Sequence, residues 1–371
     1  MHVSRSIIIS IRMRNNIFHI ISKFDIGGAE KIALNICKSQ NKNIQYHLFE
    51  VFRTKSTYRD KFIKEAKNHG IIIHQSPFKN KKLGIILFPF VFIFSYLKFK
   101  PVIIHTHTEV PDIAIYIFSK LFNPKNVNTR TIHSTKLWNN WSRLGNRIET
   151  FYQNKNCNIA ISESVRNSYI RKYKVSSIPV IYNGIDEVKQ IPYTEIKPNK
   201  INILFAGRFS YEKGIDTLIS ILDMFKNKEN LYFHIIGSGD KEKEIYEKFK
   251  ECNNVCIKDK IYNLSCYIGS FDYVLIPSLF EGLGLISLEA SLSKVPVIIN
   301  NCAGLNETTP YDWPLKVNNN SIDEYETIIS NITQYDKVRL GNIAYNYVKS
   351  KFSVCNMQNQ YEKLYNSLYE K

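Results

Sequence analysis

Two glutamates, Glu281 and Glu289, stand eight positions apart around a glycine-containing turn and the start of an apolar helix. The apolar run 271–278 predicts a buried strand, after which Gly282 and Gly284 let the backbone turn tightly and approach a ligand closely. Glu281 is therefore expected in the loop after the strand, where open α/β folds bind ligands, and Glu289 about a turn and a half into the helix. Carboxylates accept hydrogen bonds from vicinal hydroxyls, so one could hold a hexose and the other a ribose. Two solvated glutamates near a helix end would show the same spacing.

A second polar group lies upstream. A strand over 201–207 is expected to end at Gly207, and the loop after it presents Arg208 and Lys213 before a helix that begins near Gly214. A guanidinium and a mobile ammonium beside a helix N-terminus can bind a diphosphate without a metal. An ordinary basic loop is the alternative, but the two glutamates that follow favour a site for a nucleotide-sugar.

With these residues in view, the chain resembles the retaining glycosyltransferases of family 4. Six motifs in the family's order, spread over most of the sequence, carry the resemblance: Gly27-Gly28-Ala-Glu30, His105-Thr-His107, Thr131-Ile-His133-Ser134, Val180–Asp186, Gly207-Arg208 with Lys213-Gly214, and Pro277-Ser278 through Glu289. The resemblance implies the α/β fold called GT-B, in which two Rossmann-like domains place their parallel sheets across a cleft.

The sequence departs locally from the family's pattern. Lys294 and Val295 precede Pro296 where the family usually has a glycine, and Asp259 replaces a glycine in the loop after the strand near Val255. The second change leaves the recognition of the nucleobase open. Glu307 follows Asn306 where the family often ends a glycine-rich loop in glutamate, which makes Glu307 a further site candidate.

The resemblance also implies a mechanism. Arg208 and Lys213 would neutralise the diphosphate as it leaves, with neither a metal nor a cofactor, while Glu281 orients the sugar and Glu289 the ribose. His133 would contact the sugar from the acceptor side. The implied donor-binding set is Gly27, Gly28, Gly207, Arg208, Lys213, Glu281, Gly282, Leu283, Gly284, Leu285 and Glu289.

His105, His107 and Trp138 are further candidates for the acceptor side. His105 and His107 would share one face of a strand, although a metal would need a third ligand to which the sequence does not point. Trp138 and Trp141 would share one face if 135–147 is helical, with core packing as the alternative to a sugar or membrane contact.

A chain of 371 residues exceeds one ordinary core, and apolar runs alternate with helix-like segments as in parallel sheets. We expect an N-terminal acceptor domain over 1–190 and a C-terminal donor domain over 191–371, with a last helix that could return to the first domain. The polar stretch Lys189–Lys200, which contains Pro192 and Pro198, is the expected boundary.

Seven cysteines without a pair at two-residue separation argue against a zinc ribbon or a disulfide framework and for a reducing compartment. The apolar stretch before Arg12 is too short for the core of a secretion signal. Because Met13 stands just before the first strand, the first twelve residues are expected to be disordered or to follow an upstream start. We therefore expect a cytoplasmic protein.

Charge is uneven along the chain. Residues 1–190 carry 30 Lys and Arg against 11 Asp and Glu, a net charge of +19, whereas 191–371 carry 20 against 22, a net charge of −2. The basic residues are dispersed and no nucleic-acid motif accompanies them, so an anionic membrane is the expected partner. The apolar run Leu83–Leu97 follows Lys79, Lys81 and Lys82, is shorter than the ~20 residues that span a bilayer, and contains Pro89. It predicts a helix lying at the inner face of the membrane, with a buried helix as the alternative.

Three functions remain open. The first is a transferase that moves a sugar from a nucleotide-sugar to a glycan or lipid-linked acceptor in surface polysaccharide synthesis. The second is a basic nucleic-acid-binding protein, which the dispersed charge disfavours. The third is a non-catalytic GT-B scaffold, against which the intact set of Arg208, Lys213, Glu281 and Glu289 argues.

Overall fold

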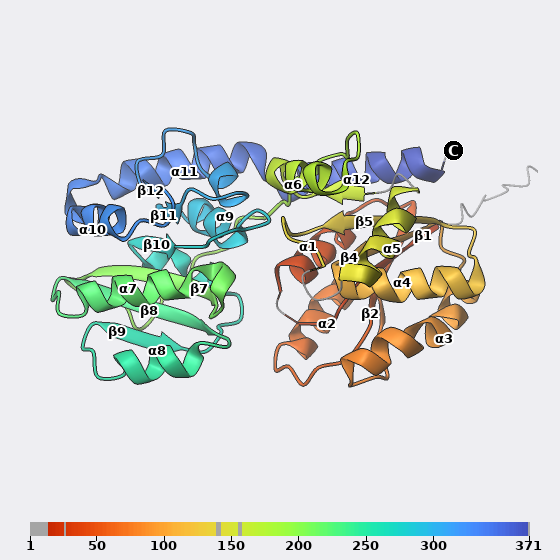
Figure 1. Cartoon of the computed structure of the whole chain (residues 1–371), viewed down its shortest axis with the longest axis horizontal. Coiled ribbons are helices and arrows are strands. Elements are labelled where there is room, and N and C mark those ends of the chain that lie inside the picture. Colours follow the sequence, from red (N-terminus) through yellow and green to blue (C-terminus); the bar gives the residue numbers. More distant parts are fainter. Residues whose placement is uncertain (1–13, 26, 139–141, 155–157, 370–371) are drawn as a thin grey trace, which may run out of the picture. The chain divides into compact units, whose positions relative to one another are not determined.

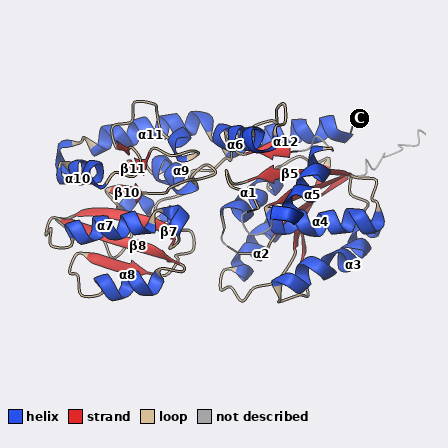
Figure 2. Cartoon of the chain, viewed as in Figure 1, coloured by secondary structure: helices blue, strands red, loops and turns tan. Residues whose placement is uncertain are grey.

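The computed structural model describes residues 14–25, 27–138, 142–154 and 158–369, and contains two six-stranded parallel sheets (Figure 1). The first twelve residues and Trp141, about which expectations were stated above, lie outside these ranges. Helices alternate with the strands along the chain, as Figure 2 shows. The predicted α/β class and the GT-B pair of Rossmann-like sheets are thereby confirmed.

The first sheet has the order β3-β2-β1-β4-β5-β6. Apart from the half-buried edge strand β3, its strands are almost wholly buried, as expected for a parallel sheet with both faces covered. The elements are β1 (Asn15–Ile21), α1 (Gly28–Cys37), β2 (Ile44–Glu50), α2 (Arg59–Asn68), β3 (Ile72–His74), α3 (Lys81–Phe99), β4 (Ile103–His107), α4 (Glu109–Phe122), β5 (Val127–Ile132), α5 (Ser142–Gln153), β6 (Asn158–Ala160) and α6 (Glu163–Tyr173).

The second sheet has the order β12-β11-β10-β7-β8-β9 and repeats the topology of the first. Its strands are β7 (Ile201–Arg208), β8 (Leu231–Ser238), β9 (Val255–Lys258), β10 (Tyr273–Ile276), β11 (Val297–Asn300) and β12 (Lys316–Val317). Its helices are α7 (Ile215–Phe225), α8 (Glu242–Phe249), α9 (Leu285–Leu292), α10 (Ile322–Ser330), α11 (Lys337–Lys351) and α12 (Val354–Tyr369). Short 3₁₀ turns are η1 (Tyr211–Lys213), η2 (Leu264–Cys266), η3 (Ile268–Ser270), η4 (Leu305–Thr308) and η5 (Ile332–Gln334).

In each sheet the strand order reverses at one point, between β1 and β4 in the first and between β7 and β10 in the second. The loops that leave the carboxyl ends of such neighbouring strands run in opposite directions and leave a crevice, which is where open α/β folds bind ligands. This topology fixes which loops can form a site before any side chain is considered.

The chain divides into two compact units. The first takes in the described residues of Met1–Arg130, Ile148–Cys157 and Leu364–Lys371, and the second those of Thr131–Arg147 and Asn158–Lys363. The stretch 189–200 forms no helix or strand. The boundary predicted at residue 190 remains a prediction.

One helix of the first unit has an unusual surface. α3 buries Ile85, Phe88 and Phe92, and the Phe92 ring packs edge-on against Phe118 of α4 at 4.8 Å. The opposite face of α3 is apolar but exposed, at helical spacing, over Leu83, Ile86, Leu87, Phe90, Val91, Phe94 and Leu97. Among the described residues, α3 is the one helix long and apolar enough to cross a membrane by length and composition. The α3 stripe is the name used below for these seven side chains.

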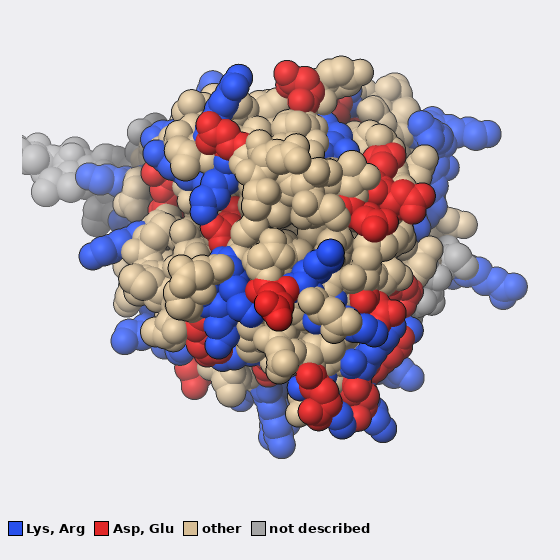
Figure 3. Space-filling view, turned by 90° about the vertical axis from the view of Figure 1, so that its left-hand side faces the viewer, with Lys and Arg blue, Asp and Glu red and all other residues tan. Residues whose placement is uncertain are grey.

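Charges are mixed on the surface of the C-terminal half. On the face drawn in Figure 3, Lys and Arg side chains lie interspersed with Asp and Glu side chains. This mixture agrees with the nearly balanced charge of residues 191–371. The six described cysteines are free, so no disulfide joins them.

Candidate functional site

The reversal of strand order between β7 and β10 brings two predicted motifs together. β7 and β10 are parallel neighbours, with Tyr273 opposite Ile203 and Val274 opposite Leu204. Their carboxyl ends therefore lie at the same edge of the sheet, and the loops that follow carry Lys213 and Glu281. The Lys213 Nζ donates to Glu281 Oε1 at 2.6 Å. The sequence predicted both loops, and the sheet order makes their side chains meet.

Glu281 is held in a well-defined position. Its side chain is 10% exposed, and the same oxygen that binds Lys213 also accepts the Ser278 hydroxyl at 2.8 Å. The backbone N–H of Glu281 donates to Ala303 O at 3.1 Å. Lys213 is 28% exposed and can donate two further hydrogen bonds, for which no partner exists among the described residues. A ligand with oxygen acceptors would find an oriented ammonium here.

Two glycines are required by the backbone of these loops. Gly214 has φ +66° and separates η1 from α7, and a Cβ there would stand 1.7 Å from Pro277 O. Gly284 has φ +77° and precedes α9, where a Cβ would stand 2.8 Å from the Leu305 side chain. An L side chain would be strained at either position and would displace the Pro277 backbone or the Leu305 side chain. The predicted helix starts near Gly214 and before Glu289 are confirmed.

Arg208 and Glu289 are the other two charged residues predicted to bind the donor. Arg208 is the last residue of β7, its side chain is 70% exposed, and it donates to Glu212 Oε1 at 3.1 Å. The structure therefore brings Lys213, but not Arg208, into contact with Glu281. Glu289 is the fifth residue of α9 and is half-buried, in agreement with the predicted turn and a half. Leu283 is a buried residue of the loop before α9, and Leu285 begins α9.

The loop 277–284, which carries Glu281 and is called the glutamate loop below, packs against the segment that carries His133. The Gly282 Cα lies so close to the His133 carbonyl that a Cβ would stand 2.1 Å from its oxygen. The Lys136 Nζ lies 3.8 Å from the centre of the Phe280 ring. Burial lowers the pKa of His133 to about 3, so its imidazole is neutral at pH 7. The predicted active-site histidine and the predicted sugar-binding glutamate thus belong to adjoining segments.

Glu307 is already engaged within the protein. Its carboxylate accepts the backbone N–H groups of Glu163 and Ser164 at 3.0 and 2.7 Å, and the Tyr182 hydroxyl at 2.9 Å. These contacts place it at the N-terminus of α6, where a carboxylate satisfies N–H groups that have no helical partner. The suggestion that Glu307 is a direct site residue is not supported, because a structural role accounts for both of its oxygens.

A hollow of about 540 Å³ lies beyond β7, at the carboxyl ends of β8 and β9. Gly237, Gly239, Tyr246 and Asp259 are among the residues that line it. Gly237 lies so near Gly207 that a Cβ would stand 1.9 Å from the Gly207 carbonyl oxygen. Along the carboxyl edge of the sheet, three features therefore follow one another: Glu281 in the loop after β10, Lys213 in the loop after β7, and the hollow at β8 and β9.

The two departures from the family pattern have structural outcomes. Lys294 adopts φ +58°, a left-handed conformation that glycine takes without strain, so the backbone geometry is kept at a cost of about 1 kcal/mol. Asp259 lies on the rim of the hollow and accepts the backbone N–H of Lys260 at 2.6 Å. The change from glycine thus adds a carboxylate to the hollow.

In the first unit, His105 and His107 join a third histidine that sequence analysis missed. His19 of β1 lies opposite His105 of β4 in the sheet, and His19 Nδ1 and His107 Nε2 are 2.9 Å apart. The Tyr365 hydroxyl lies 2.6 Å from His105 Nδ1 and 3.2 Å from His19 Nε2. All four side chains are fully buried, so the predicted contact of His105 and His107 with an acceptor is not supported.

The three histidines could be considered for a metal, because their nitrogens lie within 4.8 Å of one another. Two nitrogens on a tetrahedral metal, each bonded at about 2.05 Å, would be roughly 3.3 Å apart. The 2.9 Å between His19 and His107 instead matches a hydrogen bond. Burial lowers the pKa of His19 to about 3, so it is neutral and can both donate and accept.

Trp138 was considered for acceptor or membrane contact. Its side chain is 3% exposed and lies over Gly145, where a Cβ would stand 2.4 Å from the indole. The helix expected over 135–147 instead begins at Ser142, and Trp138 precedes it with φ +62°. Trp138 is thus a core residue.

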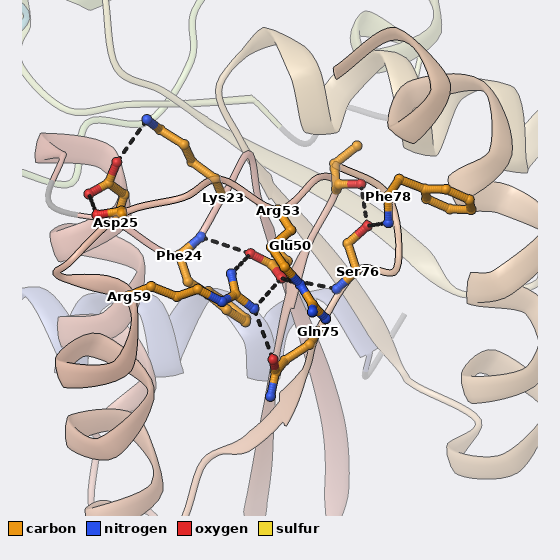
Figure 4. Close-up of polar contacts among 11 residues, drawn as sticks. Lys23, Phe24, Asp25, Glu50, Arg53, Arg59, Gln75, Ser76 and Phe78 are labelled. Carbon is orange, nitrogen blue, oxygen red and sulfur yellow. Dashed lines mark hydrogen bonds and ion pairs between the residues drawn. The ribbon is translucent and has the colours of Figure 1, made fainter. Parts of the chain in front are cut away.

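The loop that leads to the Gly27-Gly28 motif is anchored by a buried ion pair (Figure 4). Glu50, the last residue of β2, accepts the N–H groups of Phe24 and Ser76 at 3.1 and 3.0 Å, and both of its oxygens bind the Arg59 guanidinium. This carboxylate ties together the loops after β1, β2 and β3. Gly28 begins α1 a few residues after Phe24, and Gly27 precedes it in an extended conformation.

Reactive thiol chemistry does not fit this site. Cys302 lies near Glu281, and burial followed by the glutamate's negative charge raises its thiol pKa to about 12. A thiol with that pKa is protonated at neutral pH and is a poor nucleophile. The polar groups that remain are an ammonium, a carboxylate and a neutral imidazole, which suit hydroxyl and phosphate binding.

Comparisons with known proteins identify the class. Residues 187–324 match the family model "Glycosyl transferases group 1", and residues 26–189 match the model "Glycosyltransferase Family 4". The two matches adjoin and together span residues 26–324, so the chain is similar to glycosyltransferase domains over most of its length. Lys213 and Glu281 lie in the first of these matches and His133 in the second.

Two curated relatives are similar to this chain. An uncharacterized 41.2 kDa protein in the cps region of Klebsiella pneumoniae is 30% identical over 52% of this chain, and the match spans about half (56%) of that relative's length. The capsular polysaccharide biosynthesis glycosyltransferase CapH of Staphylococcus aureus is 24% identical over 80% of this chain and 84% of its own.

Among solved structures, HepE of Anabaena, crystallised in complex with UDP-glucose, superposes with a TM-score of 0.78. It is 18% identical, and the alignment covers 95% of this chain and 99% of that one. At this level of identity the likeness shows the fold.

Proposed function

We propose that this protein is a retaining glycosyltransferase that moves a sugar from a nucleoside-diphosphate sugar to a glycan acceptor in surface polysaccharide synthesis, without a metal or another cofactor. The observation that carries the proposal is the contact between Lys213 and Glu281 where the strand order reverses between β7 and β10. CapH, a relative over most of the chain, supports the polysaccharide class.

The donor is proposed to lie along the carboxyl edge of the second sheet. Its nucleobase would occupy the hollow at β8 and β9, its diphosphate would reach Lys213, and its sugar would reach Glu281, because this order follows the order of the strands. Glu289 would hold the ribose hydroxyls. The UDP-glucose complex of HepE, which shares the fold, supports a nucleotide-sugar as the donor class.

The chain's own residues would then act in three ways. The Lys213 ammonium would neutralise charge on the leaving diphosphate, and it would do so most strongly in the transition state because that charge grows as the sugar–phosphate bond breaks. Arg208, exposed in this structure, would turn from Glu212 to the same phosphates. Glu281 would accept hydrogen bonds from sugar hydroxyls, and the neutral His133 would hydrogen-bond the sugar from its other side. Retention of the anomeric configuration rests on the family resemblance.

We further propose that the acceptor is lipid-linked and that the protein lies at the cytoplasmic face of an anionic membrane. The α3 stripe is the supporting feature, since seven large apolar side chains are exposed on one face and Phe94 is 73% exposed. Lys79, Lys81 and Lys82 stand at the start of the same helix and would attract anionic headgroups.

The helix is proposed to lie in the interface rather than to span the bilayer. Its other face packs into the first unit, where Phe92 contacts Phe18, Phe49 and Phe118. Spanning would remove these rings from the core and expose the sheet they cover. An in-plane helix keeps the core intact while its stripe enters the boundary between headgroups and acyl chains.

A donor-hydrolysis assay with a panel of uridine, guanosine, thymidine and cytidine diphosphate sugars tests the central proposal. We expect slow hydrolysis of one class and unchanged activity with excess EDTA. Absence of hydrolysis and of nucleotide binding throughout the panel would favour a non-catalytic scaffold. Strict dependence on a divalent ion would refute the metal-independent mechanism.

A further inference from the structure

Ser162 joins the start of α6 to the glutamate loop. As the N-cap of α6, its Oγ accepts the Val165 N–H at 3.1 Å and donates its proton to the Gly282 carbonyl at 2.6 Å. Its side chain is fully buried, so it has no surface with which to touch a substrate. One hydroxyl thus both caps a helix and holds the residue next to Glu281.

Gly282 has little freedom to move. A Cβ there would stand 2.1 Å from the His133 carbonyl oxygen and 2.9 Å from Ile161 Cδ1, which shows how closely the backbone is packed. The hydrogen bond from Ser162 fixes the Gly282 carbonyl in the same place. Any shift of the α6 terminus would therefore be passed to Gly282 and on to the Glu281 carboxylate.

Glu307 fixes the α6 terminus itself. The N–H groups of Glu163 and Ser164 both donate to its carboxylate, and with the Val165 N–H taken by Ser162, the first three N–H groups of α6 are satisfied. Glu307 lies in η4, the turn that directly follows Gly304. A Cβ on Gly304 would stand 2.4 Å from Glu281 O. The glutamate loop is thus held on one side by the start of α6 and on the other by the segment of η4, and the Glu307 carboxylate joins these two segments.

We propose that Ser162 and Glu307 are positioning residues that set the Glu281 carboxylate, and through it the Lys213 ammonium, for sugar transfer. The inference rests on the proposed function, since it assigns a task within the same site. Misplacement of a reacting group by about 1 Å can lower a rate by about 10²-fold. Ser162→Ala removes only one of the two supports, so the glutamate loop should shift by less than about 1 Å. We therefore expect a rate loss of roughly tenfold for this variant.

Kinetic parameters of Ser162→Ala test the proposal. We expect kcat for donor hydrolysis to fall about tenfold, while the affinity for the free nucleoside diphosphate stays within about twofold, because that ligand lacks the sugar that Glu281 holds. Ser162→Thr keeps the hydroxyl and should recover most of the rate. Asp336→Ala is the matched control, since Asp336 caps α11 through the Arg339 N–H at 3.0 Å and has no contact with the glutamate loop.

Variants at the other support form a second series. Glu307→Gln replaces one of the two accepting oxygens by an NH₂ group, which cannot accept a backbone N–H. It should therefore lower kcat as Ser162→Ala does. The double variant should lose less activity than the product of the two single losses. Tyr182→Phe removes only one donor to Glu307 and should have a smaller effect. Glu163→Gln is the control, because its side chain pairs with Arg166 and only its backbone N–H is used.

Hydrogen exchange separates the failure of this inference from the failure of the proposed function. If the contacts position the loop, Ser162→Ala should speed amide exchange over 281–285, and Asp336→Ala should not. Faster exchange without activity toward any donor would refute the proposed function and with it the catalytic task assigned here. Unchanged exchange, or a kcat for Ser162→Ala equal to that of Asp336→Ala, would overturn the positioning role while leaving the proposed function standing.

Discussion

Replacing Lys213 by alanine removes the ammonium that lies 2.6 Å from Glu281. If this ammonium neutralises the leaving diphosphate, its loss should lower kcat by roughly 10²–10³-fold, about 3–4 kcal/mol, as for one electrostatic donor to a transition state. The fall should be larger in kcat than in nucleotide affinity, because the negative charge on the diphosphate grows as the bond to the sugar breaks.

The structure also predicts a cost in stability that must be separated from catalysis. Glu281 is 10% exposed and would retain only the Ser278 hydroxyl as a side-chain partner. Leaving a partly buried carboxylate without its cation costs about 1–3 kcal/mol of unfolding free energy. Denaturant unfolding of the variant should show this loss, and kinetics should be measured well below the transition.

Lys337→Ala provides a matched control. Lys337 forms an ion pair with Asp272 just before β10, whereas Glu281 follows the opposite end of that strand. Lys337 is 53% exposed, so its pair contributes at most about 1 kcal/mol and touches no proposed donor contact. Donor hydrolysis and release of nucleoside diphosphate should be unchanged in this variant.

A double-mutant cycle with Glu281→Gln sharpens the test. If the ammonium and the carboxylate act as one unit, the double variant should lose less activity than the product of the single losses. Turnover of Lys213→Ala within threefold of the parent, with Lys337→Ala equally active, would refute the assignment of Lys213 to the diphosphate.

Three further predictions concern the ribose, the membrane and pH. Glu289→Gln should weaken binding of nucleoside diphosphate, measured by calorimetry, and equal affinity would exclude the ribose role. Substituting Lys79, Lys81 and Lys82 by Glu should reduce co-sedimentation with anionic vesicles without changing donor hydrolysis, whereas equal binding of the parent to neutral vesicles would contradict the electrostatic part. Acidification from pH 7 to 5 should cost about 2 kcal/mol of unfolding free energy through His19, because the unfolded imidazole binds a proton below pH 6.5 and the buried one only below about pH 3. Stability is therefore lost as the pH falls through this window. His47, His74, His133 and His234 also have lowered pKa values, so His19→Gln should reduce the slope measured by urea unfolding by the share of one histidine; an unchanged slope would show that His19 titrates normally.

Local sequence determined the elements and the turns between them. The strand expected over 201–207 became β7, and the apolar run 271–278 contains β10, because strands buried on both faces need mostly apolar side chains. Gly284 was identified as a turn residue and Gly214 as lying near a helix start, and both adopt positive φ. These features depend on neighbours within a few residues, so a single sequence suffices to predict them. The exposed side of α3 was harder, since an apolar run does not show which of its faces is covered.

Tertiary structure decided which side chains meet. His19 joins His105 only because β1 and β4 are adjacent in the sheet, and no spacing along the chain points to that pair. Glu307, which resembled a ligand-binding residue in its motif, is used by α6, a helix more than a hundred positions away. Lys213 meets Glu281 because β7 and β10 are parallel neighbours whose carboxyl ends share an edge. A sequence specifies which groups follow each strand, but the order of strands in the sheet determines their partners, because contact depends on distance in space rather than along the chain.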